Sequence, residues 1–153
     1  MSEKHLPVTG GCLCGAVRYE SSKPPVNGGY CHCRMCQKGT GGLYSAWVQF
    51  RPDGFQFTNG EPKFYRSSEW LQRGVCPTCG SPLVVIYDED PEPVIFVGSL
   101  DHPDDWPLTQ DGWWGHSYME EKVSWHVISD DMPQFALNYP EIPEGQGGTS
   151  QGS

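Results

Sequence analysis

The hydrophobic and polar positions form short runs that glycine and proline interrupt throughout the chain. Nineteen glycines and 14 prolines divide the 153 residues, and such punctuation leaves little room for long helices. Runs rich in β-branched and aromatic residues lie between these breaks, with lengths typical of strands. The pattern predicts a mainly β fold, with strands at residues 16–20, 43–50, 55–58, 63–66, 83–87, 94–100 and 118–127.

Two local features add a turn and a helix to this pattern. The dipeptide Asn59-Gly60 predicts a hairpin turn, because it tolerates the positive φ values of a type I′ turn. Residues 34–38 predict a single short helix, which the glycines after them limit to one or two turns. We therefore expect little helix in the fold.

The C-terminal third is harder to assign to strands. Residues 101–115 are rich in Asp, Pro and Trp and predict a loop. Within it, Trp113 and Trp114 could fill the core or line a pocket, and the core is favoured because large aromatic side chains are usually buried. Residues 140–153 lack apolar periodicity, so we expect a disordered tail there and one domain at residues 1–139.

Composition and charge narrow the location and the partners. No run approaches the roughly 20 apolar residues that a membrane helix needs, and residues 1–10 lack the apolar segment of an export signal. We therefore expect a cytoplasmic protein without a membrane partner. The formal net charge of −9 argues against a nucleic-acid partner, because phosphate binding needs clustered Lys and Arg.

The seven cysteines fall into three groups along the chain. They form C-L-C at residues 12–14, C-H-C-R-M-C at residues 31–36 and C-P-T-C at residues 76–79. Closely spaced cysteines, odd in number and without an export signal, favour metal ligation over disulfides. Disulfides within the adjacent pairs remain the alternative, although they leave one cysteine over.

The ligand numbers of zinc divide these thiols into four and three. Structural zinc sites take four protein ligands, whereas catalytic sites take three and leave one position open. Cys76 and Cys79, followed by Gly80, have the form of a zinc knuckle, in which the glycine permits a tight turn. A knuckle supplies two ligands, so Cys12 and Cys14 are expected to complete a structural site.

Cys31, Cys33 and Cys36 then remain for a second zinc ion, whose fourth position is open or filled by a histidine. His32 lies inside this group, but a residue between the two ligands of a C-x-C turn usually points away from the metal. No local spacing ties the other histidines to the cysteines. The candidates for a closed site are His32, His102, His116 and His126.

The three cysteine motifs resemble those of a known family. The segments G-C-L-C-G-A-V-R-Y at residues 11–19, C-H-C-R-M-C-Q-K at residues 31–38 and C-P-T-C-G-S-P-L at residues 76–83 occur in the family's order. This is the glutathione-dependent formaldehyde-activating enzyme family, which shares a domain type with the CENP-V proteins. The resemblance runs from about residue 10 to residue 135.

The resemblance implies a zinc-stapled β-tent of short antiparallel strands with two zinc ions per chain. It also implies a carbon–sulfur lyase that adds a small thiol, such as glutathione, reversibly to formaldehyde or another small aldehyde. A non-catalytic, zinc-stabilised module that binds a protein partner is the alternative function. The implied ligands are Cys12, Cys14, Cys76 and Cys79 for a structural zinc, and Cys31, Cys33 and Cys36 for a catalytic zinc.

Glutathione carries negative charge, and so does the chain as a whole. An acidic protein attracts an anionic thiol only where a local basic patch outweighs the global field. The basic side chains that could converge on the second zinc site are Arg34, Lys38, Arg51, Arg66 and Arg73.

Overall fold

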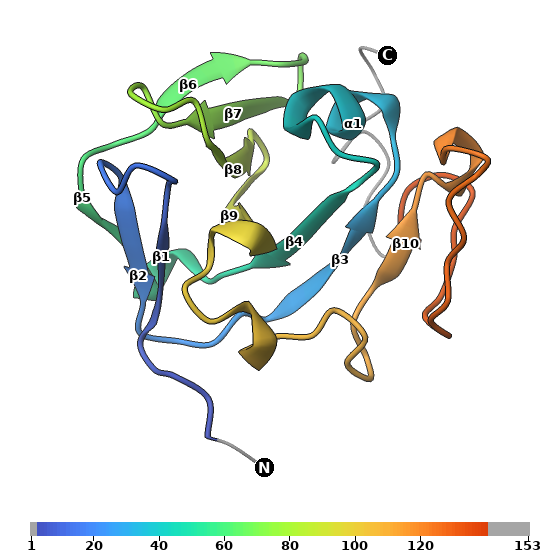
Figure 1. Cartoon of the computed structure of the whole chain (residues 1–153), viewed down its shortest axis with the longest axis horizontal. Helices are drawn as coiled ribbons and strands as arrows, with labels where there is room; N and C mark the ends of the chain where they lie inside the picture. Colours follow the sequence, from blue (N-terminus) through green and yellow to red (C-terminus); the bar gives the residue numbers. More distant parts are fainter. Residues whose placement is uncertain (1–2, 141–153) are drawn as a thin grey trace.

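The chain folds into two β-sheets with one short α-helix (Figure 1). The computed structural model describes residues 3–140, so the tail predicted to be disordered lies outside the described residues except for Pro140. Short 3-10 turns occur at Pro52–Gly54, Val97–Ser99, Pro103–Asp105 and Met119–Glu121. The main elements are β1 (Val8–Gly11), β2 (Arg18–Ser21), β3 (Asn27–Cys31), α1 (Arg34–Thr40), β4 (Ser45–Gln49), β5 (Phe55–Asn59), β6 (Lys63–Arg66), β7 (Leu71–Val75), β8 (Pro82–Tyr87), β9 (Asp90–Phe96) and β10 (Gly115–Ser117).

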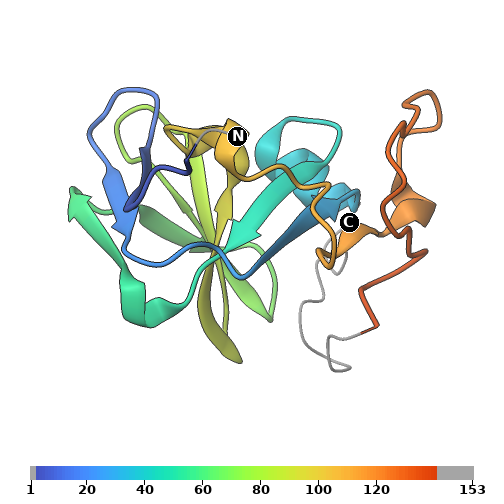
Figure 2. The ribbon, with the colours of Figure 1, turned by 90° about the horizontal axis from the view of Figure 1, so that it is seen from below.

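The strands divide into a sheet of three and a sheet of seven. The smaller sheet has the order β1-β2-β5, and the larger has the order β10-β3-β4-β9-β8-β7-β6. Neighbouring strands run antiparallel except β10 and β3, which are parallel. Figures 1 and 2 place the smaller sheet at one end of the molecule and the segment after β10 at the other. The predicted mainly β fold with little helix is confirmed.

Both sheets contribute to one hydrophobic core. Tyr19 of β2 and Ile95 of β9 are almost fully buried in the same cluster, together with Phe50 and Leu83. Trp106 is buried there too, and Trp113 and Trp114 pack against core clusters. The core interpretation of Trp113 and Trp114 is therefore confirmed, and both are partly buried.

Four strands escaped prediction because glycine weakens the strand pattern. β1, β3, β7 and β10 each contain glycine, which is depleted in strands. In β3 the reason is close packing: a Cβ at Gly28 would lie 2.7 Å from the Trp113 ring, and one at Gly29 would lie 2.7 Å from the Gly115 carbonyl oxygen. Close packing therefore requires glycine at these two positions, and these glycines are the reason that the sequence does not predict β3.

The hairpin predicted at Asn59-Gly60 is wrong. β5 pairs with β2 and β6 pairs with β7, so the turn passes from one sheet to the other. Gly60 does have a positive φ of 58°, and a Cβ there would lie 2.3 Å from the Ala16 carbonyl oxygen. The dipeptide marks a turn correctly, but the partners of its two flanking strands are set by tertiary packing.

The strand predicted at residues 118–127 is also wrong. Tyr118 has a left-handed φ of 54°, and a single 3-10 turn follows it at Met119–Glu121. The backbone N–H of Tyr118 donates to the Leu137 carbonyl at 2.8 Å. This hydrogen bond joins two loops and is not part of a β-sheet. Trp125 is 71% exposed, so this aromatic residue gives a strand signal without a sheet to pack on.

Ile95→Ala is expected to lower the free energy of unfolding by about 2–5 kcal/mol, because it leaves a cavity in the shared core. The side chain is fully buried on β9, which pairs on both sides. Val127→Ala, at an 80% exposed position, is the control and should change the free energy by about 0.5 kcal/mol or less. Urea denaturation of both metal-loaded variants measures the difference. Equal effects would contradict the assignment of the core.

Candidate metal centres

Four cysteines from two distant turns meet in what we call the four-cysteine cluster. Cys12 and Cys14 follow β1, and Cys76 and Cys79 follow β7. Their Sγ atoms all lie within 4.8 Å of one another. Cys14 Sγ is 3.6 Å from Cys12 Sγ and 3.8 Å from Cys76 Sγ. A tetrahedral zinc ion with Zn–S bonds near 2.3 Å separates its sulfurs by about 3.8 Å, so the cluster could hold such an ion.

The turn at residues 76–80 surrounds its sulfurs with hydrogen-bond donors. Cys76 Sγ accepts backbone N–H groups from Thr78 and Cys79, each at 3.4 Å. Gly80 closes the turn with φ 79° and donates to the Cys76 carbonyl at 2.9 Å. The Ser81 hydroxyl lies 3.1 Å from Cys79 Sγ, and its hydrogen bond, together with those of the Ser81 and Cys14 backbone, lowers the pKa of Cys79 to about 5. These contacts favour the thiolates that a metal ion needs.

Three further cysteines meet at the start of α1 and form the three-cysteine cluster. Cys31 ends β3, Cys33 is the N-cap of α1, and Cys36 lies in its first turn. Their Sγ atoms also lie within 4.8 Å of one another, and each residue is 5% exposed or less. No other His, Asp or Glu of the described range 3–140 joins this group. The cluster could therefore hold a metal ion with three protein ligands.

The first turn of α1 fixes the positions of these three sulfurs. Cys33 Sγ caps the helix by accepting the backbone N–H of Cys36 at 3.2 Å. The helix ends at Thr40, and the C-cap residue Gly41, with a φ of 77°, donates its N–H to the Gln37 carbonyl at 2.8 Å. Figure 1 shows α1 beside β3 and β4. The C-x-C-x-x-C spacing thus combines a strand end with a helix start.

The sulfurs of the three-cysteine cluster differ in their protonation chemistry. Burial raises the pKa of Cys31 well above its usual value. Hydrogen bonds from the Cys31 and Cys33 thiols hold the pKa of Cys36 well below its usual value, and the positive charge of Arg73 acts in the same direction. The cluster therefore favours an anionic sulfur at Cys36.

The His32 side chain belongs to a hydrogen-bonded chain of side chains that includes none of the three cysteines. His32 Nε2 lies 2.9 Å from His116 Nδ1, and His116 Nε2 lies 3.1 Å from both carboxylate oxygens of Asp130. Because a carboxylate accepts, His116 donates from Nε2, and His32 Nε2 then donates to His116 Nδ1. The His32 backbone donates to Ser117 and accepts from the Gln37 side chain. His32 therefore helps to hold the C-x-C turn in place.

The other histidines named as ligands also have different neighbours. His102 stacks on His5 with ring centroids 3.6 Å apart, and His5 Nδ1 lies 2.8 Å from an Asp105 carboxylate oxygen. The His126 ring lies 5.5 Å from Tyr44. None of these contacts brings a histidine into the three-cysteine cluster.

The basic residues considered for an anionic thiol do not gather in one patch. Arg73 is 3% exposed, and its Nη2 lies 3.8 Å from Cys36 Sγ. The other four lie elsewhere: Arg34 and Lys38 are exposed on α1, Arg51 pairs with Glu92, and Arg66 pairs with Asp88. Arg73 therefore brings a buried positive charge into contact with a sulfur of the three-cysteine cluster.

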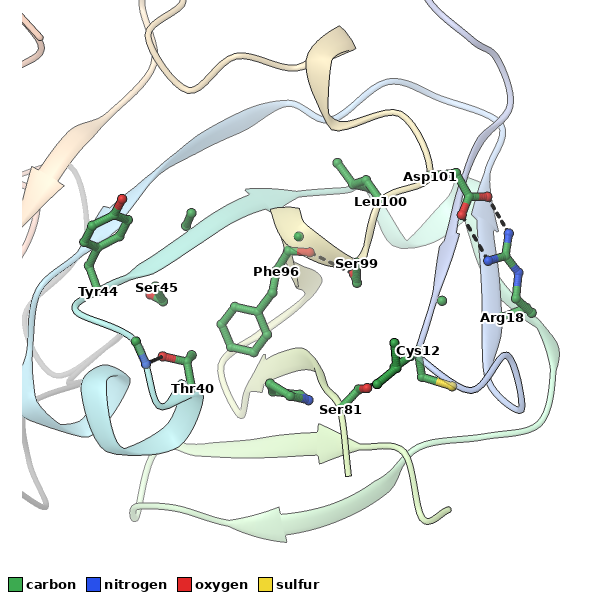
Figure 3. Close-up of a pocket in the computed structure, with 16 residues that line it drawn as sticks. Cys12, Arg18, Thr40, Tyr44, Ser45, Ser81, Phe96, Ser99, Leu100 and Asp101 are labelled. Carbon is green, nitrogen blue, oxygen red and sulfur yellow. Dashed lines mark hydrogen bonds and ion pairs between the residues drawn. The ribbon is translucent and has the colours of Figure 1, made fainter. Parts of the chain in front are cut away.

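A cleft of about 540 Å³ lies between the turn after β1 and the segment that links α1 to β4 (Figure 3). Cys12 of the four-cysteine cluster lines one side, near the ion pair between Arg18 and Asp101. Tyr44 and Ser45 line the other side, beside α1. Ser45 stands opposite Cys31 in the register of β3 and β4, so this wall of the cleft adjoins the three-cysteine cluster.

Sequence analysis named Arg73 only as one of five basic residues that could converge on the second zinc site, and it did not name Tyr44 or Ser45. A signal for Arg73 exists, because it occupies an inward position between Leu71 and Val75 on a strand that precedes the knuckle. A charged residue at a buried strand position requires a partner. Tyr44 and Ser45 carry no comparable signal, since only the pairing of β3 with β4 brings them to the cleft.

Comparisons with known proteins agree with these features. The crystal structure of a Rhodobacter sphaeroides protein has a TM-score of 0.52 and 22% sequence identity, over 71% of this chain and 99% of that chain, which shows a shared fold. No curated protein matches the chain. The family model described as "Glutathione-dependent formaldehyde-activating enzyme" matches residues 7–116, a range that includes both cysteine clusters. Because this match spans well over half of the sequence, the chain belongs to the glutathione-dependent formaldehyde-activating enzyme family.

Proposed function

We propose that the protein is a zinc-dependent carbon–sulfur lyase, which adds a small thiol reversibly to formaldehyde or a similar aldehyde. Glutathione is the proposed thiol, since the family is described by it. The observation that carries this proposal is the three-cysteine cluster, which offers three buried ligands and no fourth within the described residues. Three protein ligands with one open position are typical of catalytic zinc sites.

The two clusters would hold zinc in different roles. Cys12, Cys14, Cys76 and Cys79 would hold a structural ion, and Cys31, Cys33 and Cys36 a catalytic one. When bound at the three-cysteine cluster, zinc would supply a fourth position that binds the substrate thiol and lowers its pKa, since three anionic ligands leave it a weak Lewis acid. The role of the protein's own residues would be to position the reactants.

The proposed reaction forms one bond and moves one proton. The thiol sulfur bonds to the carbonyl carbon, the π electron pair of the carbonyl moves to its oxygen, and that oxygen gains the proton that the thiol loses. The product is an S-hydroxymethyl thioether, and the reverse reaction regenerates thiol and aldehyde. No atom changes its oxidation state in either direction, so the reaction needs no oxidant or reductant. Holding the sulfur and the carbonyl carbon close together would supply much of the acceleration.

The cleft is the proposed binding site for the rest of the thiol molecule. Its volume of about 540 Å³ lies within the range of about 300–1,000 Å³ that small-molecule sites occupy. Hydroxyl groups of Thr40, Tyr44 and Ser45 lie along the side nearest the three-cysteine cluster. These hydroxyls can accept hydrogen bonds from the amides of a peptide-like thiol, and Tyr44 can also donate to its carboxylates, whereas the Thr40 hydroxyl already donates to the Cys36 carbonyl at 2.8 Å.

The proposal is tested by the exchange rate, measured by NMR, between glutathione with formaldehyde and their hydroxymethyl adduct. A catalytic amount of zinc-loaded protein should accelerate exchange above the uncatalysed baseline. Cys31→Ser should return the rate to that baseline while circular dichroism shows a retained fold. No acceleration by protein that holds two zinc ions per chain would contradict the proposal and favour a non-catalytic module for a protein partner.

A further inference from the structure

We propose that Arg73 is the counter-ion of the three-cysteine cluster and that its guanidinium strengthens the binding of a divalent metal ion there. Arg73 would act as a positioning residue through the thiolates, without contacting the substrate. The inference rests on the proposed function in one respect, since both require a metal ion on these cysteines.

The position of Arg73 brings its charge against the cluster. The side chain lies on the inner face of β7 and is 3% exposed. Nη2 lies 3.8 Å from Cys36 Sγ, and Nε donates to the Ser67 hydroxyl at 3.1 Å. The Ser67 contact fixes the plane of the guanidinium, and the cluster lies at its other end.

Arg73 lacks the partner that a buried arginine ordinarily has. Arginine stays protonated in proteins, and buried charges are ordinarily paired. None of the ion pairs among residues 3–140 places a carboxylate on Arg73. Its Nη1 also has no hydrogen-bond partner within this range. The sulfur of Cys36 is therefore the group in contact that can carry the compensating negative charge.

The charges of the complete centre sum to zero. A divalent ion with three thiolates has a net charge of −1, and the guanidinium adds +1. Such compensation matters most where water is excluded, and each cysteine of the cluster is 5% exposed or less. Without Arg73, metal binding would leave an uncompensated negative charge inside the protein.

Gly39 of α1 provides a separate observation in favour of this arrangement. Glycine is unfavourable inside a helix, yet Gly39 lies within α1. A Cβ at this position would lie 3.1 Å from Arg73 Nη1 and 3.2 Å from Cζ. The missing side chain makes room for the guanidinium between β7 and the helix that carries Cys36.

Arg73→Met removes the charge with little change in volume, and Arg73→Lys keeps it. The measurement is competition with a chromophoric chelator for zinc, together with the sulfur-to-cobalt charge-transfer band of the cobalt-loaded protein. We expect Arg73→Met to weaken zinc binding at the three-cysteine cluster by about 10- to 100-fold, as loss of an outer-shell partner does. Arg73→Lys should recover most of the affinity, and the four-cysteine cluster should bind equally in both variants.

Arg66→Met is the matched control, because it removes a positive charge from β6, next to β7, where Arg66 pairs with Asp88 at the surface. Its affinity should equal that of the wild type. Unchanged zinc binding in Arg73→Met, or an equal loss in Arg66→Met, would overturn the proposal. A wild-type protein that binds no second ion would instead contradict the proposed function.

A second pair of variants keeps the test open if Arg73→Met does not fold. Gly39→Ala should shift the guanidinium by a few tenths of an ångström without removing it, and should weaken zinc binding at the same cluster by less than Arg73→Met does. Gly98→Ala is the control, since a Cβ there meets nothing within 4 Å. Wild-type affinity in a folded Gly39→Ala protein would count against Arg73 as the counter-ion.

Discussion

Cys76→Ser is expected to unfold the protein at temperatures where the wild type is fully folded. The four-cysteine cluster joins the turn after β1, in the three-stranded sheet, to the turn after β7, in the seven-stranded sheet. Cys76 is 1% exposed and its sulfur accepts two backbone N–H groups. Structural zinc contributes on the order of 10–16 kcal/mol in small peptide domains, which equals or exceeds the whole stability of a typical domain, about 5–15 kcal/mol.

Circular dichroism and the dispersion of amide NMR signals measure this loss. Thr78→Ser is the control in the same turn, because Thr78 is exposed and its contribution to Cys76 is a backbone N–H that the substitution keeps. This variant should fold as the wild type does. A folded Cys76→Ser protein with a nearly unchanged unfolding midpoint would show that the four-cysteine cluster is not what joins the sheets.

Cys33→Ser is expected to give the opposite result, a folded protein that has lost one zinc ion and its catalytic activity. Cys33 is the N-cap of α1, where its sulfur accepts the Cys36 N–H. Serine is a preferred N-cap residue, so the new hydroxyl can cap the helix in the same way. The metal ion loses one of three protein ligands, however, and serine is a poor replacement for a thiolate.

Three measurements on Cys33→Ser separate the roles. The zinc content should fall from two ions per chain to one, circular dichroism should match the wild type, and exchange between glutathione, formaldehyde and their adduct should fall to the uncatalysed rate. Cys33→Ala is the companion variant, since it removes both the ligand and the cap and should be less stable by about 1 kcal/mol. An unfolded Cys33→Ser protein, or one that keeps two zinc ions, would contradict the division into structural and catalytic centres.

The cysteine spacing predicted which residues would meet, because short turns restrict where their sulfurs can point. Cys12 and Cys76 are far apart in sequence, yet the ligand number of zinc was enough to place them in one group. The same reasoning could not separate Arg73 from the other four basic candidates, since its contact with Cys36 depends on the packing of β7 against α1. The spacing of cysteines can be taken from the sequence, whereas the contact between Arg73 and Cys36 arises only in the tertiary structure.

The strand predictions failed where packing overrides local preference. Gly28 and Gly29 hide β3 because Trp113 and the Gly115 backbone occupy the space of their side chains. Trp125 gave a strand signal in a segment that forms loop contacts and leaves this residue exposed.

No described helix has the length and apolar character to cross a membrane. The expected cytoplasmic location and the expected absence of a nucleic-acid partner stay predictions.

The central claim is that the protein has two metal centres of different kinds, and native mass spectrometry during stepwise addition of a chelator tests it most directly. The wild type should begin with two zinc ions per chain. The first ion should leave with the loss of adduct exchange while the charge-state distribution stays that of a compact protein, and removal of the second should unfold the chain. Simultaneous release of both ions with unfolding, or a single ion at the start, would contradict the account.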